Sequence, residues 1–175
     1  QAYYNIARRI TGERIPLMRF RRLTEPETIT EKGSVTPMNI ALIAHDNRKE
    51  LMIQFCIAYC GILSKHTICA TGTTGRVVAD ATGMDVKLFM SRAHGGVQQI
   101  GARITYDEID MVLYFSYPKD EEDEASLTYI RKLCDEHNVP IATNLATAEM
   151  LIQGLARGDL DWREIAHPRN KQRPL

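Results

Sequence analysis

The sequence predicts a three-layer α/β domain built on a parallel sheet, and three observations support this fold class. Between residues 38 and 160, short apolar segments rich in branched side chains alternate with amphipathic segments of helical length. Short apolar runs of this kind are typical of strands buried on both faces of a parallel sheet. The 175 residues, with 44% hydrophobic content, suffice for one compact domain with its own core. Strict alternation also implies right-handed crossovers, with helices on both faces of the sheet.

The pattern places five strands and five helices along this region. Strands are expected at residues 38–44, 66–70, 86–90, 109–115 and 140–143. Helices are expected at residues 48–63, 74–81, 97–105, 122–137 and 146–157. The first of these helices carries few polar side chains, so we expect it to pack against the sheet.

Three regions differ in composition along the chain. We divide it into an N-terminal extension or linker at residues 1–37, the α/β domain at residues 38–165 and a basic C-terminal tail at residues 166–175. The extension holds seven Lys and Arg against four Asp and Glu, and the tail adds three further Lys and Arg. We interpret both termini as solvated surface, with an arm that clasps a neighbouring subunit as the alternative.

Charge and composition limit the classes of partner. Lys and Arg together number 22, as do Asp and Glu, and non-specific nucleic-acid binding needs a basic surplus that this chain lacks. No apolar run approaches the roughly 20 residues of a membrane span, and the first residues do not resemble a signal peptide. The four cysteines show neither a CxxC pair nor an evident disulfide framework (Cys56, Cys60, Cys69, Cys134). We therefore expect a cytoplasmic protein with reduced thiols and with no nucleic-acid or membrane partner.

A glycine- and threonine-rich run is the strongest functional signal. Ala70-Thr71-Gly72-Thr73-Thr74-Gly75 lies between an expected strand and an expected helix. Backbone N–H groups and hydroxyls at such a junction point into one small volume at the positive end of the helix, where phosphate binds readily. The run therefore predicts a phosphate site formed by Thr71, Gly72, Thr73 and Thr74. An ordinary turn with a threonine N-cap is the alternative.

A second polar cluster follows the first expected strand. His45 and Asp46 stand at its carboxyl end, and Lys49 follows one turn into the next helix. In a parallel sheet these side chains reach the same edge as the glycine-rich run. Lys49 could pair there with phosphate, and His45 and Asp46 are candidate catalytic residues. A turn and a helix cap are the alternative for these two.

Five motifs in unbroken order suggest a family. They are residues 40–49 (IALIAHDNRK), 70–75 (ATGTTG), 81–86 (ATGMDV), 95–102 (GGVQQIGA) and 140–148 (PIATNLATA). Together with the run GDLDW near residue 160, they closely resemble the methylglyoxal synthase family over about residues 38–162. The resemblance implies a flavodoxin-like parallel α/β domain that assembles as a homohexamer. It also implies a lyase that converts dihydroxyacetone phosphate to methylglyoxal and phosphate with no metal or organic cofactor.

The resemblance assigns roles by position. Lys49, Thr71, Thr73 and Thr74 match the family's phosphate ligands, and His45 and Asp46 match its His-Asp pair. The family run Ser-Gly-Pro, whose glycine lies at the phosphate site, corresponds to Ser91-Arg92-Ala93. We therefore add Ser91 and Arg92 to the expected phosphate site, with an outward-facing Arg92 as the alternative.

Several catalytic positions depart from the family pattern. The family reads Gly-Gly-Asp-Gln-Gln with the aspartate as general base, and Val97 occupies that position. Tyr117 stands where the family has a second aspartate before a proline. The family's later histidine segment aligns with residues 119–126, which contain no histidine and are one residue shorter.

These departures lead to three functional hypotheses. Enediolate formation needs a base beside the ketone, and valine has no lone pair to accept a proton. The leading hypothesis is a domain that binds phosphate or a phosphorylated small metabolite, with lyase activity lost or weak. The first alternative is an active methylglyoxal synthase with a substitute base, for which Asp46 is the main candidate and His94 a lesser one. The second alternative is a non-catalytic structural subunit of an oligomer.

Overall fold

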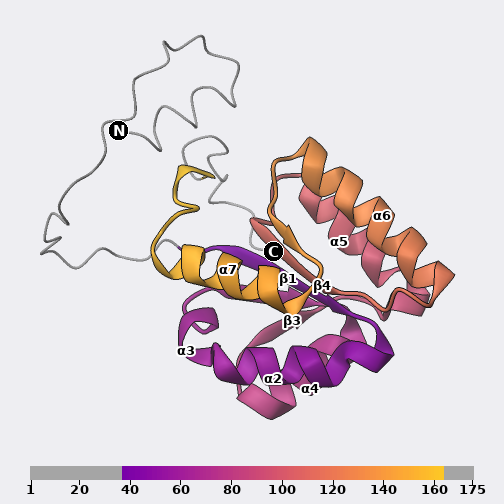
Figure 1. The fold of residues 1–175 in the computed structure, drawn as a ribbon, viewed down its shortest axis with the longest axis horizontal. Coiled ribbons are helices and arrows are strands. Elements are labelled where there is room, and N and C mark those ends of the chain that lie inside the picture. Colours follow the sequence, from indigo (N-terminus) through magenta and orange to yellow (C-terminus); the bar gives the residue numbers. More distant parts are fainter. Residues whose placement is uncertain (1–36, 164–175) are drawn as a thin grey trace, which may run out of the picture.

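Five parallel strands form one sheet in the order β3-β2-β1-β4-β5 (Figure 1). The computed structural model describes residues 37–163. The strands are β1 Asn39–Ala44, β2 Thr67–Ala70, β3 Val86–Leu88, β4 Met111–Phe115 and β5 Ile141–Ala142. Every pairing is parallel. The predicted three-layer parallel α/β class is confirmed, and each expected strand is present but one or two residues shorter than expected.

The central strand β1 is buried along its whole length. Ile40 pairs with Ile68 of β2 on one side and with Met111 of β4 on the other. Helices cover both faces of the sheet, so successive side chains of β1 enter two different cores. This explains why the strand is uniformly apolar rather than alternating.

Six α-helices and two short 3₁₀ helices connect and cover the strands of residues 37–163. They are η1 Asp46–Arg48, α2 Lys49–Ala58, α3 Cys60–Leu63, α4 Gly72–Thr82, η2 Arg92–His94, α5 Gly96–Thr105, α6 Glu121–Glu136 and α7 Leu145–Ala156. One apolar core unites the sheet with side chains of α2, α4 and α7. The other unites it with α5 and α6, which lie side by side in Figure 1. Two helical layers therefore enclose the sheet.

The expected helix at residues 48–63 is divided in the structure. Arg48 belongs to η1, and Tyr59 separates α2 from α3 with φ −109° and ψ 18°. The Tyr59 ring packs on Phe55 at 4.8 Å between ring centroids. Gly61, a poor helix former, follows two residues later. The apolar pattern runs through the break without interruption, which is why it predicts one helix.

The strand order reverses direction between β1 and β4. The connections after β1 and β2 place α2 and α4 on one face, whereas those after β3 and β4 place α5 and α6 on the other. In open α/β sheets such a reversal opens a crevice at the carboxyl ends of the strands. The segments that follow β1, β2 and β4 therefore meet at one edge.

The expected N-terminal extension, up to residue 36, and the expected basic tail lie outside the described residues. The domain limits at residues 38 and 165 thus remain predictions. None of the helices found between residues 37 and 163 is long and apolar enough to cross a membrane.

Gly96 begins α5 where the chain passes very close to the preceding turn. A Cβ at this position would overlap Met90 O and lie 2.8 Å from Met90 C, both backbone atoms that cannot turn aside. We expect Gly96→Ala to destabilise the protein by about 1–3 kcal/mol in urea unfolding. Gly61→Ala is the matched control, because a Cβ there meets nothing within 4 Å, and it should leave stability unchanged or raise it by up to about 1 kcal/mol. Equal stability of the two variants would contradict this packing.

Candidate functional site

Helix α4 begins at the carboxyl edge with unpaired backbone donors. Its N-cap Thr71 makes no side-chain capping hydrogen bond. Gly72 N–H donates to Met90 O at 3.0 Å, and Gly75 N–H donates to Thr71 O at 2.8 Å. The amides of Thr73 and Thr74 belong to the first turn, which has no acceptor inside the helix, and they donate to no other backbone group in the described part of the chain. Two amides at the positive end of a helix form a natural anion site.

The threonine hydroxyls are arranged differently from the expectation that they all meet the ligand. Thr71 Oγ1 donates to Thr74 Oγ1 at 3.2 Å, and Thr74 Oγ1 donates to Ala44 O at 3.4 Å. Both side chains are buried, whereas Thr73 is exposed. The first and third threonines thus join α4 to the end of β1, and the Thr73 hydroxyl remains accessible.

Gly72 contributes through its small size rather than through a free amide. A Cβ there would lie 2.8 Å from Phe89 O. The absence of a side chain lets the segment after β3 pass directly over the start of α4. That segment carries Ser91 and Arg92 to the same edge as the α4 amides. The Ser91 hydroxyl lies 2.6 Å from His94 Nδ1.

His45 lies at the carboxyl end of β1 with both ring nitrogens engaged. Asn47 N–H donates to Nδ1 at 3.1 Å, and Nε2 lies 2.9 Å from Asp120 Oδ2. The ring also stacks on Tyr117, with 5.2 Å between centroids and 21° between planes. His45 therefore holds no free lone pair, which argues against a role as the base.

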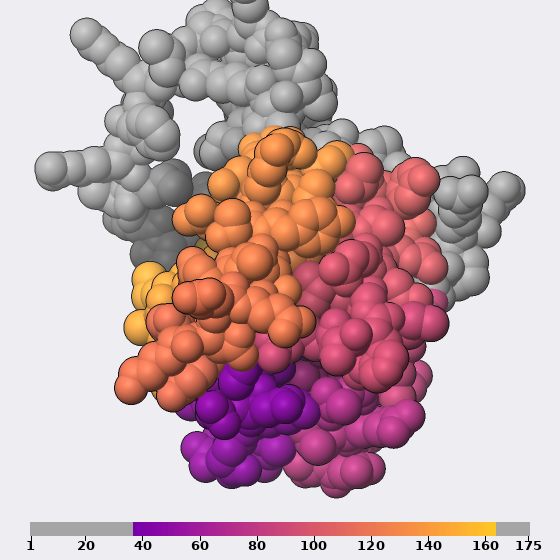
Figure 2. Space-filling model, turned by 90° about the vertical axis from the view of Figure 1, so that its right-hand side faces the viewer, coloured from indigo at the N-terminus to yellow at the C-terminus, as the bar shows by residue number. Residues whose placement is uncertain are grey.

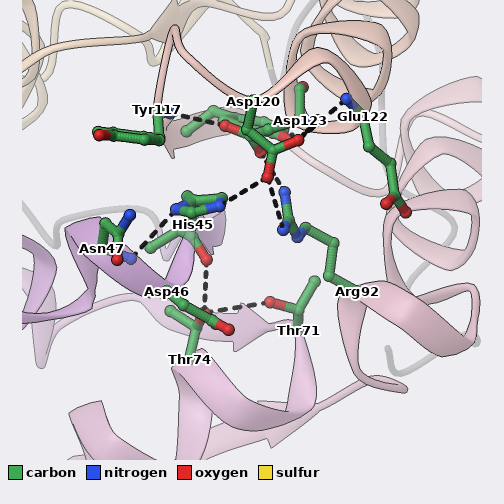
Figure 3. Close-up of polar contacts among 12 residues, drawn as sticks. His45, Asp46, Asn47, Thr71, Thr74, Arg92, Tyr117, Asp120, Glu122 and Asp123 are labelled. Atoms are coloured by element: carbon green, nitrogen blue, oxygen red, sulfur yellow. Dashed lines mark hydrogen bonds and ion pairs between the residues drawn. The ribbon is translucent and has the colours of Figure 1, made fainter.

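Asp46 is the exposed carboxylate of this edge. Its Oδ1 lies 2.7 Å from Lys49 Nζ, and 76% of its side chain is accessible to solvent. The hydrogen bond from Lys49 holds the pKa of Asp46 below its ordinary value, with further lowering by the charge of Arg92. Figure 3 shows Asp46 beside Thr74 and below His45. A carboxylate able to accept a proton is thus present near the α4 amides.

Asp120 is the residue of the site that the sequence interpretation missed. Its Oδ1 caps α6 by accepting from Glu122 N–H and Asp123 N–H, and its Oδ2 faces His45. The amide of Asp123 and the imidazole of His45 hold the pKa of the Asp120 carboxyl below its ordinary value. An aspartate directly before an acid-rich helix is the usual N-cap pattern. That signal predicts the cap but not the contact with His45, because the contact joins residues 75 positions apart.

Arg92 connects the segment after β3 to α6. Its Nη1 donates to Asp123 Oδ1 at 2.5 Å, and its Nη2 lies 3.9 Å from Asp120 Oδ2. Asp123 is fully buried and also accepts from Tyr114 OH and from Tyr117 N–H. Burial beside this carboxylate raises the pKa of Tyr114 far above the ordinary range. Arg92 is therefore held inward at the site (Figure 3), and the outward-facing alternative is wrong.

The two substituted family positions have structural roles. Val97 is 1% exposed and packs in the core beneath α5 and α6, together with Ile100 and Ile104. It therefore contributes packing and no proton transfer. Tyr117 covers one face of His45, and the guanidinium of Arg48 lies 5.8 Å from the Tyr117 ring centroid. Aromatic and cationic groups thus occupy the place of the expected second aspartate.

Comparisons with known proteins agree on one family. The family described as MGS-like domain matches residues 52–143. Methylglyoxal synthase from Caldicellulosiruptor saccharolyticus is 56% identical over 75% of this chain and 94% of its own length. The enzyme of that name from Oceanobacillus iheyensis is 50% identical over 77% of this chain and 97% of its own length. The crystal structure of methylglyoxal synthase from Elizabethkingia anophelis superposes with a TM-score of 0.60 at 37% identity, over 66% of this chain and 77% of that one.

The buried pair of Arg92 and Asp123 should be important for stability. Asp123→Ala would leave the guanidinium, the Tyr114 hydroxyl and a backbone amide without their acceptor. Because Arg92 retains some access to water, we expect a loss of about 3 kcal/mol in urea unfolding, at the lower end for a broken buried ion pair. The neighbouring exposed Glu124→Ala should stay within about 0.5 kcal/mol of the wild type. A stable Asp123→Ala protein would show that this network is not needed for folding.

Proposed function

The chain belongs to the methylglyoxal synthase family, and we propose that it catalyses the family's reaction with Asp46 as the base. Dihydroxyacetone phosphate would lose a proton from the hydroxymethyl carbon beside its ketone, giving an enediolate. Cleavage of the C–O bond to phosphate would then leave the enol of methylglyoxal, which tautomerises to the ketoaldehyde. Atoms balance as one triose phosphate giving one methylglyoxal and one phosphate.

One observation carries this proposal: a solvent-accessible carboxylate stands at the edge where α4 offers unpaired amides. The phosphate would lie on the amides of Thr73 and Thr74, with Lys49 and Arg92 supplying positive charge. Asp46, held ionised by Lys49, would lie beside the carbon skeleton. The depressed pKa makes it a weaker base than an ordinary carboxylate. Typical enzymes have kcat values of about 1–10³ per second. We therefore expect the kcat of this chain to lie below the kcat of a typical enzyme.

The rival function is a binding module that holds phosphate or a phosphorylated metabolite without turning it over. The burial of Val97 favours it, because the family's base position is now part of the apolar core. The two functions share the anion site and differ only in proton transfer. An assay with dihydroxyacetone phosphate therefore separates them.

Assembly as a homohexamer, implied by the family, is part of the proposal. Large apolar side chains are exposed on the described domain, among them Met90, Tyr106 and Met150. Such side chains could be covered by neighbouring subunits.

We expect the purified chain to convert dihydroxyacetone phosphate to methylglyoxal and phosphate, and Asp46→Asn to reduce kcat by about 10²–10⁴-fold. The physical reason is that the amide keeps the shape of the carboxylate but cannot accept the proton. Asp80→Asn, an exposed aspartate farther along α4, is the control and should keep full activity. Absence of turnover in the wild type would leave the binding module as the function. Full activity of Asp46→Asn would exclude Asp46 as the base.

Phosphate should protect the chain against unfolding through the α4 amides, the accessible Thr73 hydroxyl and Lys49. At about 100 times its dissociation constant, phosphate is expected to add about 2.7 kcal/mol of stability. The double change Lys49→Ala and Thr73→Ala should remove most of this gain, as read by melting temperature. Lys65→Ala, an exposed lysine just before β2 at the opposite edge of the sheet, should keep it. No protection of the wild type at millimolar phosphate would favour a purely structural subunit.

A further inference from the structure

We propose that Asp120 is a positioning residue that fixes the orientation and tautomer of His45, with a proton on Nε2 directed at Asp120 and a lone pair on Nδ1 directed at the Asn47 amide. In this state the ring serves the site as a hydrogen-bond donor and not as a base. The catalytic consequence rests on the proposed function, whereas the tautomer itself does not. Four features of the structure lead to this assignment.

The first feature is the backbone amide on Nδ1. Asn47 N–H lies 3.1 Å from His45 Nδ1. An amide nitrogen can only donate, so Nδ1 must present its lone pair. A neutral imidazole with a lone pair on Nδ1 carries its proton on Nε2.

The second feature is the acceptor on the other nitrogen. Asp120 Oδ2 lies 2.9 Å from Nε2, and an ionised carboxylate can only accept a hydrogen bond. Both partners of the ring thus require the same tautomer. A backbone donor at Nδ1 and a carboxylate at Nε2 are incompatible with the other tautomer, which carries its proton on Nδ1.

The third feature is the fixed orientation of the Asp120 carboxylate. Its Oδ1 accepts from Glu122 N–H at 3.0 Å and from Asp123 N–H at 3.2 Å at the start of α6. Arg92 Nη2 lies 3.9 Å from the oxygen that faces His45. The carboxylate is therefore aligned by a helix start and keeps its negative charge beside a guanidinium. Figure 2 shows the indigo residues, at about positions 40–50, at the surface next to orange residues of the region that includes α6.

The fourth feature is the confinement of the ring itself. Tyr117 stacks on one face of His45, and 10% of the His45 side chain is exposed. The backbone N–H of His45 also donates to Phe115 O at 3.0 Å, which ties the end of β1 to the end of β4. A ring flip would break both nitrogen contacts and the stacking. One ring orientation is therefore strongly favoured.

These four features give the ring a defined chemical role. Nε2–H can be shared between Asp120 and a ligand oxygen, such as the ketone oxygen that becomes the enediolate. Accepting a proton from the ligand at Nδ1 would place two donors, Nδ1–H and Asn47 N–H, against each other. His45 is thus suited to polarise an oxygen, and proton abstraction falls to another group.

The test is Asp120→Asn in the full chain, with the histidines labelled with ¹⁵N. Asparagine caps helices as well as aspartate does, so α6 keeps its N-cap. Its amide group, however, presents N–H in place of Oδ2, which opposes Nε2–H. In the wild type we expect the ¹⁵N spectrum of His45 to show protonated Nε2 and unprotonated Nδ1. In the variant this single-tautomer signature should be lost, and kcat for dihydroxyacetone phosphate should fall by roughly 10²-fold or more, with little change in phosphate binding.

Asn144→Ala is the matched control for the helix cap. Asn144 Oδ1 caps α7 by accepting from Thr147 N–H at 3.0 Å, and its loss should leave the His45 spectrum and kcat unchanged. A wild-type spectrum with Nδ1 protonated would overturn the proposal, as would an unchanged His45 spectrum in Asp120→Asn. A shifted tautomer with unchanged kcat would refute the catalytic consequence alone. If the wild type shows no turnover, the proposed function fails, and the spectra still decide the role of Asp120.

Discussion

The reversal of strand order between β1 and β4 is the constraint on which the site depends. It brings the end of β1 against the end of β4, where His45 N–H donates to Phe115 O. Helix α2, which follows β1, and helix α6, which follows β4, pack on opposite faces of the sheet. The edge between the two strand ends therefore stays open. The hydrogen bond between His45 and Asp120 crosses this edge at 2.9 Å. These residues, distant in sequence, become neighbours because β1 and β4 are adjacent in the sheet.

The charged side chains at this edge form pairs of opposite charge. Lys49 pairs with Asp46, and Arg92 pairs with buried Asp123. These pairs still leave groups able to meet a ligand: Lys49 and Arg92 retain N–H donors, and Asp46 retains a second oxygen. The unpaired amides at the start of α4 add a fixed positive potential. Such an edge can attract a phosphate ester while keeping a carboxylate beside it.

Much of the architecture could be predicted from the sequence, because apolar periodicity reflects burial on the two faces of the sheet. All five strands follow from it, and so does the existence of α4, although this helix begins at Gly72, two residues before the expected start. The break at Tyr59 could not be predicted, since the apolar pattern continues through it. The motifs predict the neighbourhood of His45, Asp46 and the threonines, which follow consecutive strand ends. The roles of Asp120 and Asp123 could not be predicted, because they depend on how α6 is oriented against β1. The inward orientation of Arg92 depends in turn on Asp123, a contact across 31 positions.

The account centres on an anion held by the first turn of α4 beside a carboxylate. A crystal structure of the full chain grown with inorganic phosphate tests it most directly. The account predicts one phosphate with oxygens within hydrogen-bonding distance of the Thr73 and Thr74 amides, and with Lys49 and Arg92 directed toward it. A phosphate bound elsewhere, or an α4 start that remains empty at saturating phosphate, would contradict the account.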